Sequence, residues 1–275
     1  MFPTCTPIMV HVAPFSRILA VLCLTFCGCV HAAGDDTIST DRPDFVESSQ
    51  VVGRGRVQLE TSVQWDRQRS DASRERTFST PTLLRIGVGE STELRIETDG
   101  RTVVHASSSS SGVRANTAGY ADSAVGVKWH LADQQDRQAS LGLLLHADLP
   151  SGSRELRGHG VRPSLRLAAE WDLAQDLSFG IMPGVAVDRG DDNRRYGYGI
   201  LAATVGKEFD ERVRGFVELA APQIARASSG GTQASFDTGL TYLIDKDIQA
   251  DFLLMHGLNR RTPDLSVAIG LSVRM

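Results

Sequence analysis

The most constraining feature of this chain is a series of short segments in which apolar and polar side chains alternate residue by residue. In residues 57–65, Val, Leu, Thr, Val and Trp occupy the odd positions, and Gln, Glu, Ser and Gln lie between them. Residues 265–273 repeat the pattern near the other end of the chain. A period of two is the period of a β-strand and gives a helix no apolar face. The pattern therefore predicts strands with one apolar face.

Twelve segments are predicted as strands. They are residues 56–66, 82–89, 92–99, 120–131, 139–149, 163–172, 177–188, 196–208, 212–220, 234–244, 248–258 and 265–275. Several have the length that a tilted strand needs to cross the hydrocarbon of a bilayer, which is about 9 to 11 residues. In lipid, the backbone groups of such strands must pair within a closed sheet.

The connections between these segments alternate between long and short. The long set is 68–77, 100–119, 150–162, 189–195, 222–232 and 259–263; the short set is 89–91, 132–137, 173–176, 209–211 and 245–247. Outer-membrane barrels have short periplasmic turns and long external loops, whereas both ends of a soluble β-sandwich face water. The predicted fold is all-β: a transmembrane antiparallel up-and-down β-barrel of about 12 strands, with both termini in the periplasm.

The first 33 residues have the features of a secretory signal peptide. One charge, Arg17, precedes an apolar run from Ile18 to Val30, and small residues follow it. The run is shorter than the roughly 20 residues of a membrane-spanning helix. We expect cleavage after Ala32 or Ala33. Residues 34–55 would then form an N-terminal periplasmic or luminal segment before the barrel of residues 56–275, and the protein would be integral to the bacterial outer membrane.

All four cysteines, at positions 5, 23, 27 and 29, lie within this leader. The mature chain therefore has no thiolate ligand and no disulfide. Removal of Arg17 changes the formal net charge from −4 to −5, which does not favour a nucleic-acid partner. The histidines form no close pair, and no glycine-rich loop joins a strand to a helix, so we expect no metal site and no cofactor. A lipoprotein signal at Cys29 is the alternative to plain cleavage.

Arginine is the main cation of the chain, and many arginines fall in or beside the long connections. These are Arg67, Arg69, Arg74, Arg76, Arg154, Arg157, Arg162, Arg189, Arg194, Arg195, Arg260 and Arg261. Guanidinium groups bind phosphate in a bidentate manner. Outer-membrane lipids and lipopolysaccharide are therefore expected partners, with simple solvation of the loops as the alternative. The serine-rich stretch within residues 106–116 is expected to be mobile.

Aromatic residues at strand ends predict two girdles at the membrane interfaces. The predicted girdle residues are Trp65, Trp129, Trp171, Phe179, Tyr198, Phe236 and Tyr242. The opposite faces of the strands carry ionisable residues of both signs. The predicted lumen and solute path comprises Glu60, Glu93, Arg95, Glu97, Lys128, His146, Arg166, Glu170, Arg214 and Glu218. Opposite charges would pair across strands, and twelve strands enclose an interior of intermediate width, so we expect a narrow or gated passage.

The opening residues Thr40, Asp41, Arg42, Pro43 and Asp44, followed by the strand from Val57, resemble the start of a family of outer-membrane barrels described as meta-pathway phenol-degradation transporters. Shorter similarities continue through most of the mature chain. The resemblance implies an outer-membrane barrel that passes organic compounds, with no firmly assigned substrate. Such barrels usually end in an aromatic residue that the barrel-assembly machinery reads, whereas this chain ends in Arg274 and Met275.

The opening motif admits two structural interpretations. Arg42 could pair with a luminal carboxylate such as Glu60, Glu93 or Glu97, which would make the segment a plug stiffened by Pro43. Alternatively, the motif is a capped lead-in to the first strand. The sequence leaves both open.

Three functions follow from a barrel of this kind. We expect a channel for passive passage of small-molecule solutes, with aromatic or apolar compounds favoured. A structural or surface-binding barrel without transport is the alternative. A lipid-modifying enzyme is less favoured, because it needs a nucleophile and a base on the lipid face near one rim. His256 is placed there, but its predicted neighbours include Phe236 and Leu265 and no serine.

Overall fold

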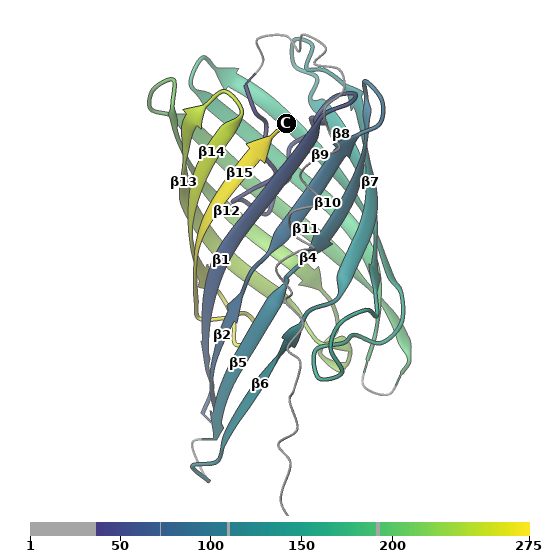
Figure 1. Ribbon diagram of the computed structural model, residues 1–275, viewed down its shortest axis with the longest axis vertical. Helices are drawn as coiled ribbons and strands as arrows, with labels where there is room; N and C mark the ends of the chain where they lie inside the picture. The colour runs from purple at the N-terminus through teal and green to yellow at the C-terminus, as the bar shows by residue number, and fades with distance from the viewer. Residues whose placement is uncertain (1–36, 72, 109–110, 191–192) are drawn as a thin grey trace, which may run out of the picture. The chain divides into compact units, whose positions relative to one another are not determined.

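The alternating segments form one antiparallel sheet that closes on itself. The computed structural model describes residues 37–71, 73–108, 111–190 and 193–275, so the predicted leader and its cysteines lie outside the described residues. The strands are β1 Val57–Arg69, β2 Ser73–Ser79, β3 Thr82–Gly87, β4 Thr92–Thr98, β5 Arg101–Ser108, β6 Arg114–Tyr120, β7 Ser123–Ala132, β8 Ser140–Leu149, β9 Arg162–Ala174, β10 Leu177–Arg189, β11 Arg195–Glu208, β12 Val213–Ile224, β13 Gln233–Asp245, β14 Ile248–Gly257 and β15 Leu265–Arg274. Pairing of β15 with β1 closes the barrel (Figure 1).

Fifteen strands give twelve passages of the chain through the wall, because three passages are interrupted. Thr80 and Pro81 separate β2 from β3, and two-residue breaks likewise divide β4 from β5 and β6 from β7. Pro81 has no N–H to donate to a neighbouring strand, which explains the first break. The predicted fold class, a twelve-stranded antiparallel barrel, is confirmed.

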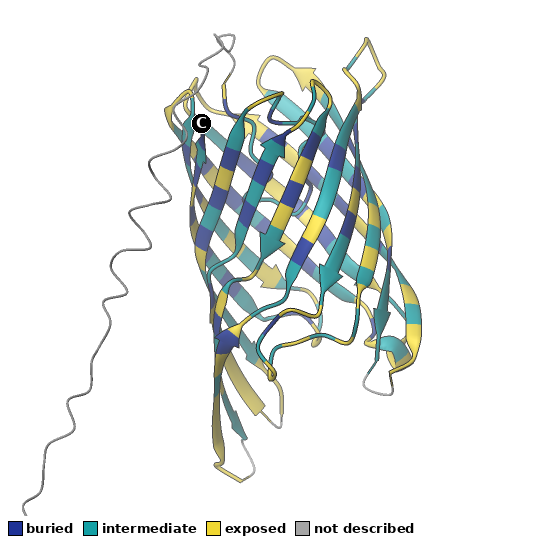
Figure 2. Ribbon diagram, turned by 45° about the vertical axis from the view of Figure 1, so that its right-hand side comes forward, coloured by how far each residue is buried: buried dark blue, intermediate teal, exposed yellow. Residues whose placement is uncertain are grey.

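Burial follows the predicted alternation along the strands (Figure 2). In β1, Gln58 and Glu60 are completely buried, whereas Val63 is 61% exposed. In β15, Ser266 and Ser272 are buried and Ile269 is exposed. The polar face therefore points into the barrel and the apolar face points outward, as lipid requires. Among the described residues, no helix has the length and apolar character to cross a membrane.

The two ends of the barrel differ in their connections. Turns 88–91, 175–176, 209–212 and 246–247 are short and lie at the end where Val57 donates to the carbonyl of Met275. Connections 150–161 and 225–232 are longer and lie at the opposite end, with the short 3₁₀ turn Ala227–Ser229 in the second of them. Connection 258–264, at that same end, has seven residues, as does 133–139 at the first end. By the rule for outer-membrane barrels, the end that holds Val57 and Met275 is periplasmic.

The first two predicted long loops are wrong. Most of residues 68–77 and 100–119 form β2, β5, β6 and the end of β1, which extend the sheet beyond the rest of the barrel (Figure 1). We call this extension, Asp66–Arg69 with β2, β5 and β6, the flap. The serine-rich stretch that was expected to be mobile lies largely in the β5–β6 hairpin, where Ser107 is opposite Arg114. Strand pairing uses backbone groups and therefore does not require apolar side chains.

Six of the seven predicted girdle residues lie on the outer face. Trp65 and Phe236 lie toward the external end; Trp129, Trp171, Phe179 and Tyr242 lie toward the periplasmic end, where the rings of Trp171 and Phe179 are 5.7 Å apart. Tyr198 is a wrong prediction. It shares a face with Ile200 and Ala202, which are 7% and 1% exposed, and this face lines the lumen. Its position at a strand end suggested a girdle, but its place in the alternation assigns it to the interior.

Residues 37–55 contain no strand, and all but the exposed Thr37, Arg54 and Gly55 at their two ends lie inside the barrel. They bond to strands around the whole wall, from β1, β3 and β4 through β7 and β9 to β12 and β14. We call residues 37–55 the plug segment. Of the two interpretations of the opening motif, the luminal plug is therefore the one that the structure shows.

At Gly87 the backbone of the plug segment lies so close to the wall that no side chain fits between them. A Cβ atom added there would lie 1.6 Å from the carbonyl oxygen of Gly53, which is backbone and cannot move aside cheaply. We predict that Gly87→Ala lowers the free energy of unfolding by about 1–3 kcal/mol, the usual cost of overpacking. Denaturant unfolding in detergent micelles measures this. Gly89→Ala is the control, because its nearest contact would be an ordinary 3.7 Å; equal effects of the two changes would contradict the proposed fit.

Candidate functional site

Three cations from neighbouring strands meet on one side of the lumen. Arg85 on β3 is directly opposite Arg95 on β4, and Lys128 on β7 is opposite Glu93. All three cations are at most 2% exposed. Like charges directly opposite each other destabilise a sheet, and buried charges need partners. This part of the wall therefore requires anions.

Asp41 of the plug segment supplies the central anion. Its carboxylate lies 2.7 Å from Nζ of Lys128 and 3.4 Å from Nη1 of Arg85, and it accepts a hydrogen bond from Nη1 of Arg95. The backbone N–H of Ser48 also donates to it, at 2.9 Å. One buried carboxylate thus contacts cations from three strands, and Glu60, Glu93 and Glu47 supply the remaining negative charge.

Glu47 extends this network around the wall. Its two carboxylate oxygens lie 2.7 Å from Nη2 of Arg95 on β4 and 2.7 Å from Nη1 of Arg166 on β9. Since β4 and β9 are separated by β7 and β8 in the sheet, Glu47 joins distant parts of the barrel.

Carboxylates of the wall hold the backbone of the plug segment. Glu218 accepts hydrogen bonds from the N–H groups of Phe45 and Val46, both at 2.8 Å. Glu60 accepts from Asp41, Glu93 from Val52, and Glu170 from Ser49. A segment without strands cannot pair its own backbone, so these bonds replace the missing ladder.

A small apolar contact completes the seat of the plug segment. Val46 packs with Met182, Ala202 and Ala220, and Phe45 lies against this cluster. These four residues are 0–4% exposed. The plug segment is therefore held by packing as well as by charge.

The carboxyl groups of the plug segment respond differently to burial. Burial by itself raises the pKa of Asp41, but the charges of Arg85, Lys128 and Arg95 outweigh it and hold the pKa well below its usual range. In the same way, Arg95 and Arg166 overcome the burial of Glu47 and lower its pKa. Burial dominates at Asp44, whose pKa is raised although Arg214 lies 3.5 Å away.

The predicted luminal residues all lie on the inner face, but the ring of Glu93, Arg95, Lys128, Arg166 and Glu170 does not surround an empty passage. Each of the five contacts the plug segment. Glu60, Arg214 and Glu218 do so as well. Glu97 and His146 pair with each other at 3.4 Å. Whether these residues conduct solute stays a prediction.

One predicted pairing is wrong. Arg42 donates to the hydroxyl of Ser62 at 2.6 Å and does not pair with Glu60, Glu93 or Glu97. The charge relation is reversed, because Glu60 and Glu93 are occupied by Arg85 and by N–H groups of the plug segment, and Glu97 pairs with His146. Asp41 and Glu47 make the ion pairs instead. The sequence signal for such an anion is the presence of Arg85, Arg95 and Lys128 on the inner face of adjacent predicted strands.

The lumen between the plug segment and the external end is accessible to water. Its wall carries Glu97, Asp148 and Asp188, whose side chains are 44%, 49% and 29% exposed. The interior thus has two parts: one is filled by the plug segment, and the other, which carries these exposed side chains near the external end, we call the vestibule. Among the described residues, no group of three metal-ligating side chains is present.

We predict opposite behaviour for two substitutions three residues apart. Asp41→Asn leaves buried cations without their anion and is expected to weaken binding of the plug segment by about 3–5 kcal/mol. Asp44→Asn is expected to change it little, because the raised pKa shows that the site favours the neutral form. Limited proteolysis within residues 37–55 on the folded barrel measures release. Equal cleavage of both variants would contradict the proposed role of Asp41.

The pH dependence of this binding follows from the same shifts. Asp41 and Glu47 have lowered pKa values, so their stabilisation is present above the ordinary carboxyl pKa of about 4 and is lost as the pH falls through the lowered values. Asp44 has a raised pKa, so its contribution is present below about 4 and is lost as the pH rises through the raised value. We predict that the plug segment stays bound from pH 7 to about 4 and loosens only below that. Hydrogen exchange of residues 41–52, corrected for its intrinsic pH dependence, checks this; release near pH 6 would contradict it.

Comparison with known proteins places this barrel among outer-membrane proteins. The model of a family described as "Putative MetA-pathway of phenol degradation" matches residues 40–275. The fold is similar to that of an outer-membrane channel from Pseudomonas putida F1, with 12% identity, a TM-score of 0.61, and coverage of 85% of this chain and 99% of that one. It is also similar to the β domain of the Bordetella autotransporter BrkA, with 12% identity, a TM-score of 0.52, and coverage of 79% and 98%. No curated protein sequence matches the chain.

Proposed function

The chain belongs to the family described as "Putative MetA-pathway of phenol degradation", and we propose that it is an outer-membrane channel for passive passage of small solutes. The closed barrel with an apolar outside and a polar interior supports a membrane location. The fold shared with an outer-membrane channel is consistent with this role. The family description favours aromatic compounds such as phenols as solutes.

The observation that carries the proposal is the division of the lumen into a vestibule and a plugged part. Water reaches Glu97 and Asp148 in the vestibule, whereas Asp41 and Glu47 close the periplasmic part through ion pairs. The plug segment is joined to the barrel wall covalently at β1. Displacement of the plug segment would therefore open a continuous path, so that the channel is gated.

The chemistry of the path suits small aromatic compounds that carry a polar group. A hydroxyl can donate to Glu97 or Asp148, and after displacement of the plug segment an aromatic ring can stack on the guanidinium of Arg95 or Arg166. A solute would then pass by replacing its contacts with one carboxylate or guanidinium by similar weak contacts with the next. Because the wall carries both acidic and basic side chains, it does not favour strong binding of a charged solute of either sign.

A structural barrel without transport is the alternative that the plug segment favours, because the path is closed as it stands. We do not propose an enzyme. His256 lies on the outer face opposite Phe236 and Leu265, neither of which is a nucleophile. The proposal also includes removal of the leader after Ala32 or Ala33, which the intact mass of the purified protein would establish.

Planar-bilayer recording distinguishes the channel from the inert barrel. We predict that Asp41→Asn combined with Glu47→Gln raises the open probability at least about tenfold over the wild type, because both ion-paired anions are lost. Asp44→Asn is the matched control and should resemble the wild type. Liposomes that contain the double variant should take up phenol faster than a sugar of similar size. No current and no uptake with any variant, including deletion of residues 37–52, would remove the channel proposal.

A further inference from the structure

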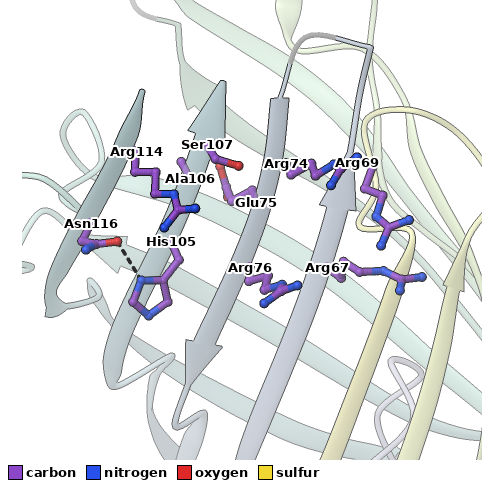
Figure 3. A pocket seen from close by; sticks show the side chains of 10 residues that line it. All are labelled: Arg67, Arg69, Arg74, Glu75, Arg76, His105, Ala106, Ser107, Arg114 and Asn116. Carbon is purple, nitrogen blue, oxygen red and sulfur yellow. Dashed lines mark hydrogen bonds between the residues drawn. The ribbon is translucent and has the colours of Figure 1, made fainter. Parts of the chain in front are cut away.

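The outer face of the flap carries a dense group of arginines. The strand register places Arg67 opposite Arg76 and Arg69 opposite Arg74 across the β1–β2 pair. On β5 and β6, Arg114 lies opposite Ser107, which is itself opposite Arg74. Figure 3 shows these guanidinium groups on one side of the sheet.

These arginines are not neutralised within the described part of the chain. Among described residues, no carboxylate forms an ion pair with Arg67, Arg69, Arg74, Arg76 or Arg114. Glu75 also lines the hollow between them, but it alternates with Arg74 and Arg76 along β2, and its partners in the register are Gln68 and Ala106. The Nε atom of Arg67 is buried without a hydrogen-bond partner.

Two directly opposed arginine pairs are unfavourable for the sheet itself. Like charges in this arrangement destabilise a strand pair, and serine or threonine at the four arginine positions would form the same strand pair without this repulsion. A hollow of about 500 Å³ lies over the group, lined also by His105 and Asn116, which bond to each other at 2.8 Å. The concave shape and the uncompensated charge together indicate a site for an anion.

The position of the group identifies the source of that anion. The next row of the register toward the membrane is Trp65, Phe78 and Val103, with Phe78 45% exposed. Same-face residues along a strand are about 7 Å apart, so the two arginine rows lie roughly 7 and 14 Å beyond this aromatic row. They face outward, continuous with the apolar surface that includes Val63. A lipid packed against that surface would bring its head group to the arginines.

We propose that the outer face of the flap binds the phosphate groups of a phosphorylated glycolipid of the outer leaflet, the lipid A part of lipopolysaccharide. Paired guanidinium groups take phosphate oxygens in a bidentate manner. The apolar row below receives the acyl chains. The bound lipid neutralises the opposed arginines and stabilises the flap, which has no partner strand beyond β6. This site is separate from the lumen and does not depend on transport.

The test compares two double variants of equal charge change. Arg69→Gln with Arg74→Gln removes one arginine row, and Arg154→Gln with Arg226→Gln removes two exposed arginines of external loops off the flap. Binding of bisphosphorylated lipid A to the purified protein in detergent micelles is measured, with dephosphorylated lipid A and inorganic phosphate as further probes. We expect the flap variant to lose affinity for the phosphorylated lipid by about tenfold or more, because two charge-assisted hydrogen bonds to phosphate are removed. The affinity of the loop variant should change by less than about twofold.

A second readout separates binding from a structural role. Without lipid, the flap variant should be at least as stable as the wild type, because an opposed like-charge pair is gone. Arg67→Gln with Arg76→Gln should repeat both results. Equal affinity loss in the two double variants, or equal binding of dephosphorylated lipid A, would overturn the proposal. Displacement of the lipid by millimolar inorganic phosphate would show that free phosphate is the ligand and would also overturn it.

Discussion

The structure depends on neutralisation of buried charge inside the barrel. Arg85, Arg95 and Lys128 lie on neighbouring strands with almost no access to water, and the wall alone does not supply enough anions on that side. Asp41 and Glu47 complete the balance from a segment that has no secondary structure of its own. Barrel and plug segment are therefore one electrostatic unit, and any path through the lumen has to break ion pairs before it opens.

The barrel could be predicted because lipid imposes a period of two on every strand. Once Val57 and Leu59 identify the outer face of β1, the same rule assigns Glu60 inward, and it does so for each later strand. All ten luminal residues proposed from the sequence lie inside for this reason. The predicted long connections near 150–162 and 222–232 are also found, at the end opposite the short turns 175–176 and 246–247.

The predictions for the flap, Tyr198 and Arg42 are wrong because they concern features that the two-residue alternation does not determine. The flap strands carry arginine on the outer face and mostly small or polar residues on the inner face, so backbone pairing forms them without a regular apolar alternation. Tyr198 lies at the end of its strand, where a girdle residue is expected, but on the inner face of the sheet. Arg42 and Asp41 are adjacent in a segment without regular structure, so the choice of the ion-paired residue depends on three-dimensional contacts that only the folded lumen supplies.

The flap leaves β6 as an edge of the sheet, since β5 is the one strand that β6 pairs with in the described part of the chain. At the end of β6, loop residue Ser153 bonds to both backbone groups of Tyr120. An unpaired strand edge is a template on which a second chain can add a strand, and a crowded membrane brings such edges together often. The strand is seven residues long, its last residue is covered by Ser153, and it carries a charged Arg114 at its exposed start. Short length and charge discourage edge-to-edge association, so neighbouring molecules can stay separate at high surface density.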